Sequence, residues 1–313
     1  MLNLSLRQLR SFVAAARHLS FARAAEELHL TAPAVSMQIR ELETALGLPV
    51  FERTGRAVSL TTTGEYLLVY ARRVLNTLKE AEDTIARLRG LQAGRISIGM
   101  VGTAQYFLPR LLALFRLEHP GVDVRLTVGN RDQLGRQLHD REIDLAIMGR
   151  PPRELDTRAE PFAANLLGVI AAHGHPLVGE RSIAPGRLDR EVFIVRETGS
   201  GTRAAMEAFF REQRITPPAV MQMSSNETIK QAVIANMGLT LLSLHTLGLE
   251  LQVGQLAVLD VVGLPLKRAW HVVNLSSMTL SPATEAFRYF ILERGEQLLT
   301  DLFAPTIKEA VRR

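Results

Sequence analysis

Apolar side chains recur at helical spacing in two short stretches that adjoin each other within residues 20–46. The first stretch follows Ser20 and the second follows Thr31, and both are good N-cap residues. Pro33 stands in the first turn of the second stretch, where its missing N–H costs nothing. The pattern predicts two helices joined by a tight turn. Their apolar positions are Phe21, Ala24, Ala25 and Leu28, then Val35, Ile39, Leu42 and Leu46.

Two neighbouring features make this helix pair a candidate DNA-reading module. An earlier helical stretch supplies apolar residues for a three-helix core, and residues 50–60 predict a strand, a tight turn and a strand. Arg53 and Arg56 of this hairpin wing could reach phosphates or the minor groove. The alternative is an ordinary helical hairpin with a solvated outer face. The groups that the second helix could show to base edges in a major groove are Thr31, Ala32, Ser36, Met37, Gln38 and Arg40.

A long amphipathic helix is predicted from Gly64 to about Arg89. Its apolar residues alternate steps of four and three, which is the spacing of a coiled coil. We therefore expect a helix that pairs two copies of the chain, so that the DNA target is an interrupted palindrome. The alternative is an amphipathic helix that packs on its own domain. The apolar positions are Leu67, Ala71, Val74, Leu78, Ala81, Ile85 and Leu88.

Beyond Arg95 the pattern changes to short strands that alternate with helices, which is typical of a doubly wound parallel sheet. Two such stretches follow one another, and residues 270–275 predict a strand that returns to the first lobe before a closing helix at 283–299. The expected fold is therefore α/β, with two lobes joined by two crossing strands, as in periplasmic-type binding proteins. A ligand would lie in the cleft between the lobes.

Composition narrows the class of protein. At 313 residues and 47% hydrophobic residues, the chain exceeds one ordinary core, so two or more domains are expected. The net charge of +5 is compatible with a nucleic-acid partner. Without cysteine there are no disulfides, thiolate metal sites or cysteine nucleophiles. The sequence shows no signal segment and no apolar run long enough for a membrane span, so a cytoplasmic protein without a membrane partner is expected.

The strongest candidate for ligand chemistry is the segment 195–203, VRETGSGTR. A strand runs into a Gly-Ser-Gly turn that opens a helix, so backbone N–H groups and the helix N-terminus would form a cradle for an anion. The alternative is a glycine turn that serves only helix–strand packing. Further candidates stand at other strand ends, where open α/β sheets bind ligands. The expected effector-binding residues are Gly102, Thr103, Asn130, Arg150, Arg196, Ser200, Gly201, Thr202, Arg203 and Asn226.

Catalytic and metal chemistry find little support in the sequence. His173 and His175 lie beside Pro176 without further ligands at suitable spacing, so a turn is the simpler interpretation and no metal is expected. Ser200 lies outside a nucleophile-elbow pattern, and no set of acid, base and nucleophile can be assembled. We expect a protein that is not an enzyme and has no cofactor. The competing hypothesis is a small-molecule binding protein or enzyme whose N-terminal module only oligomerises.

The N-terminal residues 4–61 resemble the winged helix-turn-helix of LysR-type transcriptional regulators, through the run SFARAAEELHLTAPAVSMQIRELETALGLPVFER and then LTTTG. In this family Ala32 stands where glutamine is frequent and Met37 where arginine is frequent. These departures suggest apolar contact with thymine methyl groups or reading of DNA shape. The expected DNA-contacting residues are Ser20, Arg23, Thr31, Ala32, Pro33, Ser36, Met37, Gln38, Arg40, Arg53 and Arg56, and the resemblance itself points to Ala32, Pro33, Ser36, Met37 and Arg56.

The phrases MGRPPREL, RETGSGTR, SNETIKQAV and LLSLHTLGLEL resemble the LysR-type subgroup that controls Calvin-cycle (RuBisCO) operons. This resemblance implies an activator of carbon-fixation genes, a dimer or dimer of dimers on double-stranded promoter DNA, and contact with RNA polymerase. It also implies a phosphorylated or carboxylated effector, with NADPH among the candidates. The expected domains are the winged helix-turn-helix at 1–63, a dimerising linker helix at 64–91 and an effector domain at 92–313. Lobe I would comprise about 92–163 and 268–313, and lobe II about 164–267.

Overall fold

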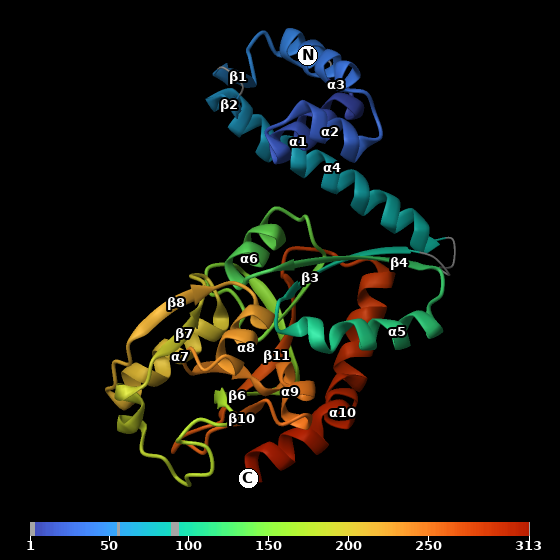
Figure 1. The fold of residues 1–313 in the computed structure, drawn as a ribbon. Coiled ribbons are helices and arrows are strands. Elements are labelled where there is room, and N and C mark those ends of the chain that lie inside the picture. The colour runs from blue at the N-terminus through green and yellow to red at the C-terminus, as the bar shows by residue number, and fades with distance from the viewer. Residues whose placement is uncertain (1–3, 55–56, 89–93, 313) are drawn as a thin grey trace. The chain divides into compact units, whose positions relative to one another are not determined.

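The computed structural model describes residues 4–54, 57–88 and 94–312, and it divides into two compact units, 1–89 and 90–313. Figure 1 shows the helical N-terminal unit and the larger α/β unit. Each unit is described by itself. Within the described ranges, no helix has both the length and the apolar character needed to cross a lipid bilayer.

Unit 1 is a winged helix-turn-helix, as predicted. Its helices are α1 (Leu6–His18), α2 (Phe21–Leu28) and α3 (Ala32–Leu46), and its wing pairs β1 (Phe51–Thr54) with β2 (Ala57–Leu60) antiparallel. Ser20 and Thr31 cap α2 and α3, as expected from their sequence positions. Three phenylalanine rings pack together in the core, with Phe51 of the wing 5.5 Å from Phe12 in a tilted arrangement and 5.4 Å from Phe21 in an edge-to-face arrangement, between ring centroids.

The long helix α4 spans Thr62–Leu88 and begins two residues before Gly64. The Thr61 hydroxyl accepts a hydrogen bond from the Gly64 N–H at 3.0 Å. Gly64 is needed there, because a Cβ atom would lie 2.1 Å from the Val50 carbonyl oxygen.

The predicted heptad stripe of α4 is wrong at its start. Ala71 is buried in the unit 1 core and cannot contact a second copy, and Leu67 is partly buried against the same core. Ile85 and Leu88 have side chains outside the described residues. The large apolar residues exposed on the described part of α4 are Tyr66, Val69, Tyr70 and Val74, and of these Val74 belongs to the predicted stripe.

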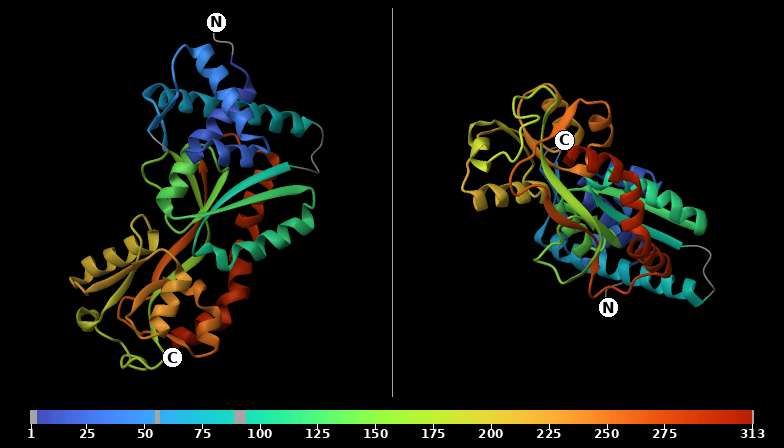
Figure 2. Two further views of the ribbon diagram at one scale, coloured as in Figure 1. Left: turned by 45° about the horizontal axis from the view of Figure 1, so that its top comes forward. Right: turned by 90° about the horizontal axis from the view of Figure 1, so that it is seen from below.

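Unit 2 is built on a mixed sheet of seven strands, which corrects the expected doubly wound parallel sheet. Strand β3 (Gly94–Val101) pairs in parallel with β4 (Val122–Gly129) and β5 (Leu145–Met148). The long strand β6 (Thr157–Ala172) and β11 (Leu266–Leu275) pair antiparallel with each other. They are antiparallel because the chain leaves lobe I through β6 and returns through β11, as Figure 2 shows. The two crossing strands were therefore predicted, although each begins earlier than expected.

Lobe II adds shorter strands on the far side of β6. Both β9 (Thr240–Ser243) and β10 (Leu256–Val258) pair antiparallel with β6, and β7 (Phe193–Arg196) pairs in parallel with β8 (Ala219–Met223) in a separate sheet. Helices α7 (Gly201–Gln213) and α8 (Asn226–Ile234) belong to this lobe. Other elements of the unit are η1 (Ala104–Tyr106), α5 (Leu108–Glu118), α6 (Arg131–His139), η2 (Pro185–Arg190), η3 (Leu244–Thr246), α9 (Gly248–Gln252) and α10 (Pro282–Arg312).

Each lobe has its own hydrophobic core. The lobe I core joins α5 and α10 to the sheet around Phe107, Phe115, Trp270 and Phe287. The lobe II core joins α7 to β6, β7 and β9 around Phe193 and Phe209. Because β6 and β11 contribute to both lobes, the ends of several strands and helices meet where the chain crosses from one lobe to the other.

Candidate functional site

The start of α3 presents its side chains outward from unit 1. Thr31, Pro33, Met37 and Arg40 are exposed, and Met37 is 56% exposed despite being apolar. Ala32 and Ser36 are partly exposed on the same part of the helix. Arg23 of α2 is exposed, and Ser20 is partly buried at the α2 N-cap. This surface has the size and chemistry to enter a major groove.

Gln38, Arg53 and Arg56 were also expected to contact DNA. Gln38 does not lie on this surface, because its side chain is buried and its amide oxygen accepts a hydrogen bond from Ser11 of α1. Arg53 is part of β1, opposite Val58, but its side chain lies outside the described residues. Arg56 lies outside the described residues altogether.

A cavity in unit 2 lies between the two lobes. Lobe I lines it with the ends of β3, β4 and β5 and the residues that follow them, and lobe II lines it with the β7–α7 junction. Asn165 and Leu167 of β6 and Arg268 of β11 line it from the crossing strands. The lining includes the four arginines Arg131, Arg150, Arg196 and Arg268 and, within the described part of the chain, no Asp or Glu.

The β7–α7 junction forms one wall of this cavity. Ser200 is the N-cap of α7, and its hydroxyl accepts a hydrogen bond from the Arg203 N–H at 3.5 Å. Gly199 has φ +85°, and a Cβ atom there would lie 2.8 Å from Asp132 Oδ2 of lobe I. Both constraints favour glycine, since it tolerates the left-handed region and has no side chain to collide with the opposite lobe. Next to this glycine, Ser200, Gly201 and Thr202 at the start of α7 line the cavity.

The four arginines differ in how their charge is balanced. Arg131 pairs with Asp132 at 2.9 Å, and Arg196 forms two hydrogen bonds to the Glu197 carboxylate at 2.8 and 3.0 Å. For Arg150 and Arg268, no carboxylate of the described residues lies within ion-pair distance. Burial, followed by repulsion from Arg131, Arg153 and Arg268, lowers the pKa of Arg150 from its ordinary value. The cavity therefore carries positive charge that an anionic ligand can neutralise.

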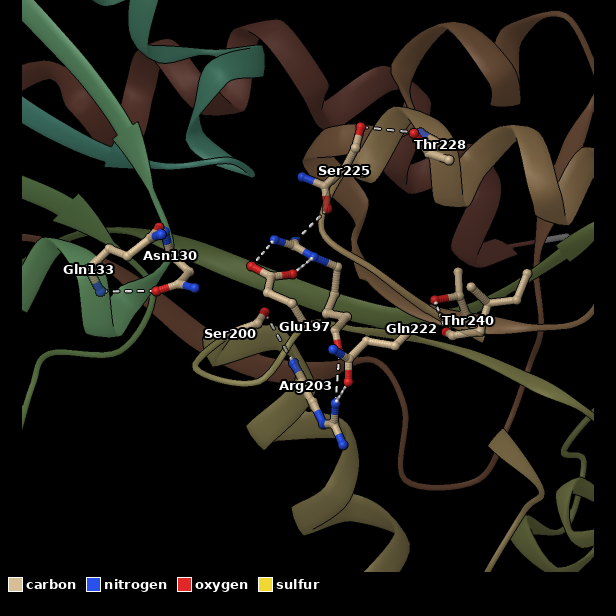
Figure 3. A network of polar contacts seen from close by, with 12 residues as sticks. Asn130, Gln133, Glu197, Ser200, Arg203, Gln222, Ser225, Thr228 and Thr240 are labelled. Atoms are coloured by element: carbon tan, nitrogen blue, oxygen red, sulfur yellow. Dashed lines mark hydrogen bonds and ion pairs between the residues drawn. The ribbon is translucent and has the colours of Figure 1, made fainter. Parts of the chain in front are cut away.

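Two residues expected at the site do not line the cavity. Arg203 donates to Glu207 at 2.7 Å and to the Arg196 carbonyl oxygen at 3.1 Å, and Figure 3 shows it beside Gln222. Its guanidinium is thus used within lobe II. Asn226 is buried behind Arg196, whose Nη1 donates to its Oδ1 at 2.6 Å. Its Nδ2 is buried without a hydrogen-bond partner among the described residues and lies 3.7 Å from where a Cβ atom of Gly102 would stand.

The other expected effector residues do line the cavity, together with residues that the sequence did not single out. Gly129 and Met148 are strand-end neighbours of predicted residues, whereas Asn165 and Arg268 lie within β6 and β11. Both residues lie before the predicted start of their crossing strand, so the strand pattern gave no signal for either of them. The expected residues that line the cavity are Gly102, Thr103, Asn130, Arg150, Arg196, Ser200, Gly201 and Thr202.

Comparison with known families matches both units. Residues 6–65 match the bacterial regulatory helix-turn-helix protein, lysR family, and residues 89–296 match the LysR substrate binding domain. Together the two matches account for most of the chain. They identify the N-terminal unit as a DNA-binding module and not only an oligomerising one.

Named relatives match over nearly the whole length. The HTH-type transcriptional regulator CfxR of Cupriavidus necator is 51% identical over 296 residues, covering 95% of this chain and 93% of that protein. The RuBisCO operon transcriptional regulator of Allochromatium vinosum is 48% identical over 297 residues, covering 95% of this chain and 98% of the relative.

One solved structure is similar to unit 2 and contains a ligand. The regulatory domain of CcmR from Synechocystis PCC6803, solved in complex with 2-PG (2-phosphoglycolate), is 40% identical in sequence. The match has a TM-score of 0.62 and covers 64% of this chain and 96% of that one.

Proposed function

The chain belongs to the LysR family of transcriptional regulators, and from this premise we propose that it activates carbon-fixation operons in response to an anionic metabolite. Family membership makes it a DNA-binding regulator and not an enzyme. The identity of about half of all residues to a RuBisCO operon regulator supports the choice of target genes.

The proposal that the protein binds an anionic effector rests on the cavity between the lobes. A ligand with acidic oxygens can accept hydrogen bonds from the N-terminal turn of α7 in lobe II and pair with Arg150 and Arg268 on the other walls. A small molecule with a phosphoryl group and a carboxylate, such as 2-phosphoglycolate, fits this chemistry. The complex of the CcmR regulatory domain supports the same choice.

The proposed mechanism is a shift between pre-existing arrangements of the two lobes. A ligand that touches both lobes binds best to the arrangement in which both sets of groups reach it. Lobe I contributes Arg150 and lobe II contributes Ser200 and Thr202. The ligand therefore stabilises one lobe arrangement, and the assembled protein alters how its DNA-binding units are held.

The DNA half of the proposal uses α3 as the recognition helix, with Ala32, Pro33, Ser36, Met37 and Arg40 facing the major groove. We infer that the exposed stripe of α4 pairs two chains. Two recognition helices would then read the halves of an interrupted palindrome. A dimer of dimers on the promoter, in contact with RNA polymerase, completes the proposed complex.

The ligand half is tested by calorimetric titration of the full chain with 2-phosphoglycolate, comparing wild type with Arg150→Gln and Arg268→Gln. Each substitution removes a charge that has no carboxylate partner within the described residues, so we expect affinity to fall roughly 10-fold to 100-fold, as for hydrogen bonds to charged groups. Arg187→Gln is the control, since Arg187 pairs with Glu180 on the surface of lobe II. Equal affinity in all four proteins would contradict the proposed site.

A further inference from the structure

We propose that Asn165 is a specificity-determining residue of the cavity, and that a buried chain of hydrogen bonds from Trp270 turns its amide nitrogen towards the ligand. This inference rests on the proposed function, because it concerns the same cavity. Asn165 lies on β6 directly opposite Arg268 of β11, so their side chains share one face of the sheet. Both residues line the cavity.

The chain of contacts begins at a side chain that can only donate. The indole Nε1–H of Trp270 donates to His245 Nδ1 at 3.4 Å. Nδ1 must therefore carry its lone pair and no proton. His245 is also held in place by rings on two sides, with its centroid 4.7 Å from Phe303 and 6.2 Å from Phe107.

Because the lone pair of His245 Nδ1 is occupied, it determines whether Ser243 donates to or accepts from Asn165. Ser243 Oγ lies 3.5 Å from His245 Nδ1 and 2.7 Å from Asn165 Oδ1. A neutral ring nitrogen has a single lone pair in the ring plane, and Trp270 already uses it. The Ser243 proton therefore goes to the other neighbour, which must be the amide oxygen of Asn165.

Because Ser243 donates its proton to Asn165, only one of the two possible orientations of the Asn165 amide is allowed. If the amide were rotated by half a turn, its nitrogen would donate to Ser243, and Ser243 would need His245 Nδ1 as its acceptor. His245 Nδ1 already accepts the hydrogen bond from Trp270. The oxygen of Asn165 thus faces Ser243, and Nδ2 lies on the Gly149 side, 3.0 Å from where a Cβ atom of Gly149 would stand. Among the described residues, Nδ2 has no hydrogen-bond acceptor.

The consequence for the ligand is a further donor beside Arg268. An NH₂ group presents protons, so it favours a phosphoryl or carboxylate oxygen at this point of the ligand over a group that can only donate. Asn165, Ser243, His245 and Trp270 are all buried, so water does not compete along the chain of contacts. Burial of His245 also lowers its pKa to about 4, which keeps the ring neutral at physiological pH, as the contact with Trp270 requires.

The test is calorimetric titration of the full chain with 2-phosphoglycolate in two kinds of variant. Asn165→Ala removes the donor, and we expect a roughly 10-fold loss of affinity, as for a hydrogen bond to a charged group. Ser243→Ala leaves Asn165 in place but frees its amide to rotate, and we expect a loss of roughly three-fold to 10-fold. The control is Thr240→Val, which removes another buried hydroxyl of β9, one that donates to the Ile194 carbonyl oxygen and not to Asn165.

The outcomes separate this inference from the proposed function. Weaker binding in Asn165→Ala and Ser243→Ala, with wild-type affinity in Thr240→Val, supports it. If the wild type binds 2-phosphoglycolate and Asn165→Ala binds it with an affinity within two-fold of the wild type, the role of Asn165 is overturned and the proposed function stands. An equal loss in Ser243→Ala and Thr240→Val overturns the hydrogen-bond chain, since any buried hydroxyl would then matter. A wild-type protein that binds neither 2-phosphoglycolate nor inorganic phosphate overturns both proposals.

Discussion

The arginine side chains in and near the cavity show why residue type alone is a poor guide to a ligand site. Arg196 and Arg203 stand in the segment that most strongly suggested an anion cradle, yet Glu197 neutralises the first and Glu207 and Gln222 engage the second. Arg268 lies far from that segment in sequence and has no carboxylate partner among the described residues. The charge offered to a ligand therefore depends on which carboxylates pack nearby, and this is settled by tertiary structure.

The backbone part of the candidate site was easier to predict. Gly102, Thr103 and Asn130 follow parallel strands, whose carboxyl ends meet at one edge of a sheet, and all three line the cavity. Ser200, Gly201 and Thr202 follow from the glycine turn and its N-cap. Asn165 was missed because an asparagine inside a strand has no local signal, and its role emerges only with Ser243, which is distant in sequence.

Protonation of the single residue His245 should make the stability of the folded chain depend on pH. The ordinary histidine pKa is 6.5, and burial lowers that of His245 to about 4. Between these values the unfolded chain binds the proton and the folded chain does not. The free energy of unfolding should therefore be unaffected above pH 6.5 and fall by up to about 1.4 kcal/mol per pH unit as the pH drops towards 4.

The measurement is urea unfolding of wild type and His245→Gln between pH 7 and pH 4.5. Carboxylates titrate over the same range in both proteins, so the difference between the two curves isolates His245. We expect the wild type to lose stability more steeply than the variant as the pH falls. Parallel curves would show that His245 is protonated in the folded chain as readily as in the unfolded chain.

At the level of elements, the strands with charged residues were the hardest to predict. The first half of β6 carries Arg158, Glu160 and Pro161, and the start of β11 carries Lys267 and Arg268. Both stretches lack an apolar alternation because their polar residues have other roles. Glu160 pairs with the buried Arg288 of α10, and Arg268 faces the cavity. The helix-turn-helix was predictable because its caps, turn and apolar stripe are all local in sequence.

Helix α4 illustrates the same limit in a helix. The heptad rule identified an apolar stripe but could not show that Leu67 and Ala71 are used within unit 1. The large apolar residues left exposed on the described part of α4 are Tyr66, Val69, Tyr70 and Val74, which are 69%, 57%, 60% and 47% exposed. Four exposed apolar residues on one helix indicate a contact surface. We infer that this stripe is where two chains pair.

A double substitution tests that inference. Tyr70→Glu with Val74→Glu places two charges in the stripe of each chain, and by two-fold symmetry four in the interface. Each buried apolar side chain contributes about 1.5–3 kcal/mol, so we expect the dimer Kd to rise roughly 100-fold or more. Sedimentation velocity measures the change. Leu249→Glu on α9, where Leu249 is 73% exposed, is the matched control, and a double variant as dimeric as this control would contradict the pairing surface.

For the whole molecule, regulation requires that the ligand distinguish between two states. A ligand that contacts one lobe only would bind open and closed arrangements equally and would shift neither. The proposed effector touches Arg150 of lobe I, Ser200 of lobe II and the crossing strands that connect the lobes. Its binding energy can therefore favour one arrangement, and linkage requires that DNA binding in turn alter effector affinity.

The most direct test of this account is a nuclease-protection footprint of the full chain on a carbon-fixation promoter, with and without saturating 2-phosphoglycolate. The account predicts that the ligand changes the length of the protected segment or the positions of enhanced cleavage within it, because it alters how the paired recognition helices are held. At a lower ligand concentration, near the wild-type Kd, the footprint of Arg150→Gln should change less than that of the wild type, because the substitution weakens ligand binding. A wild-type footprint that stays identical while calorimetry shows the ligand bound would contradict the account.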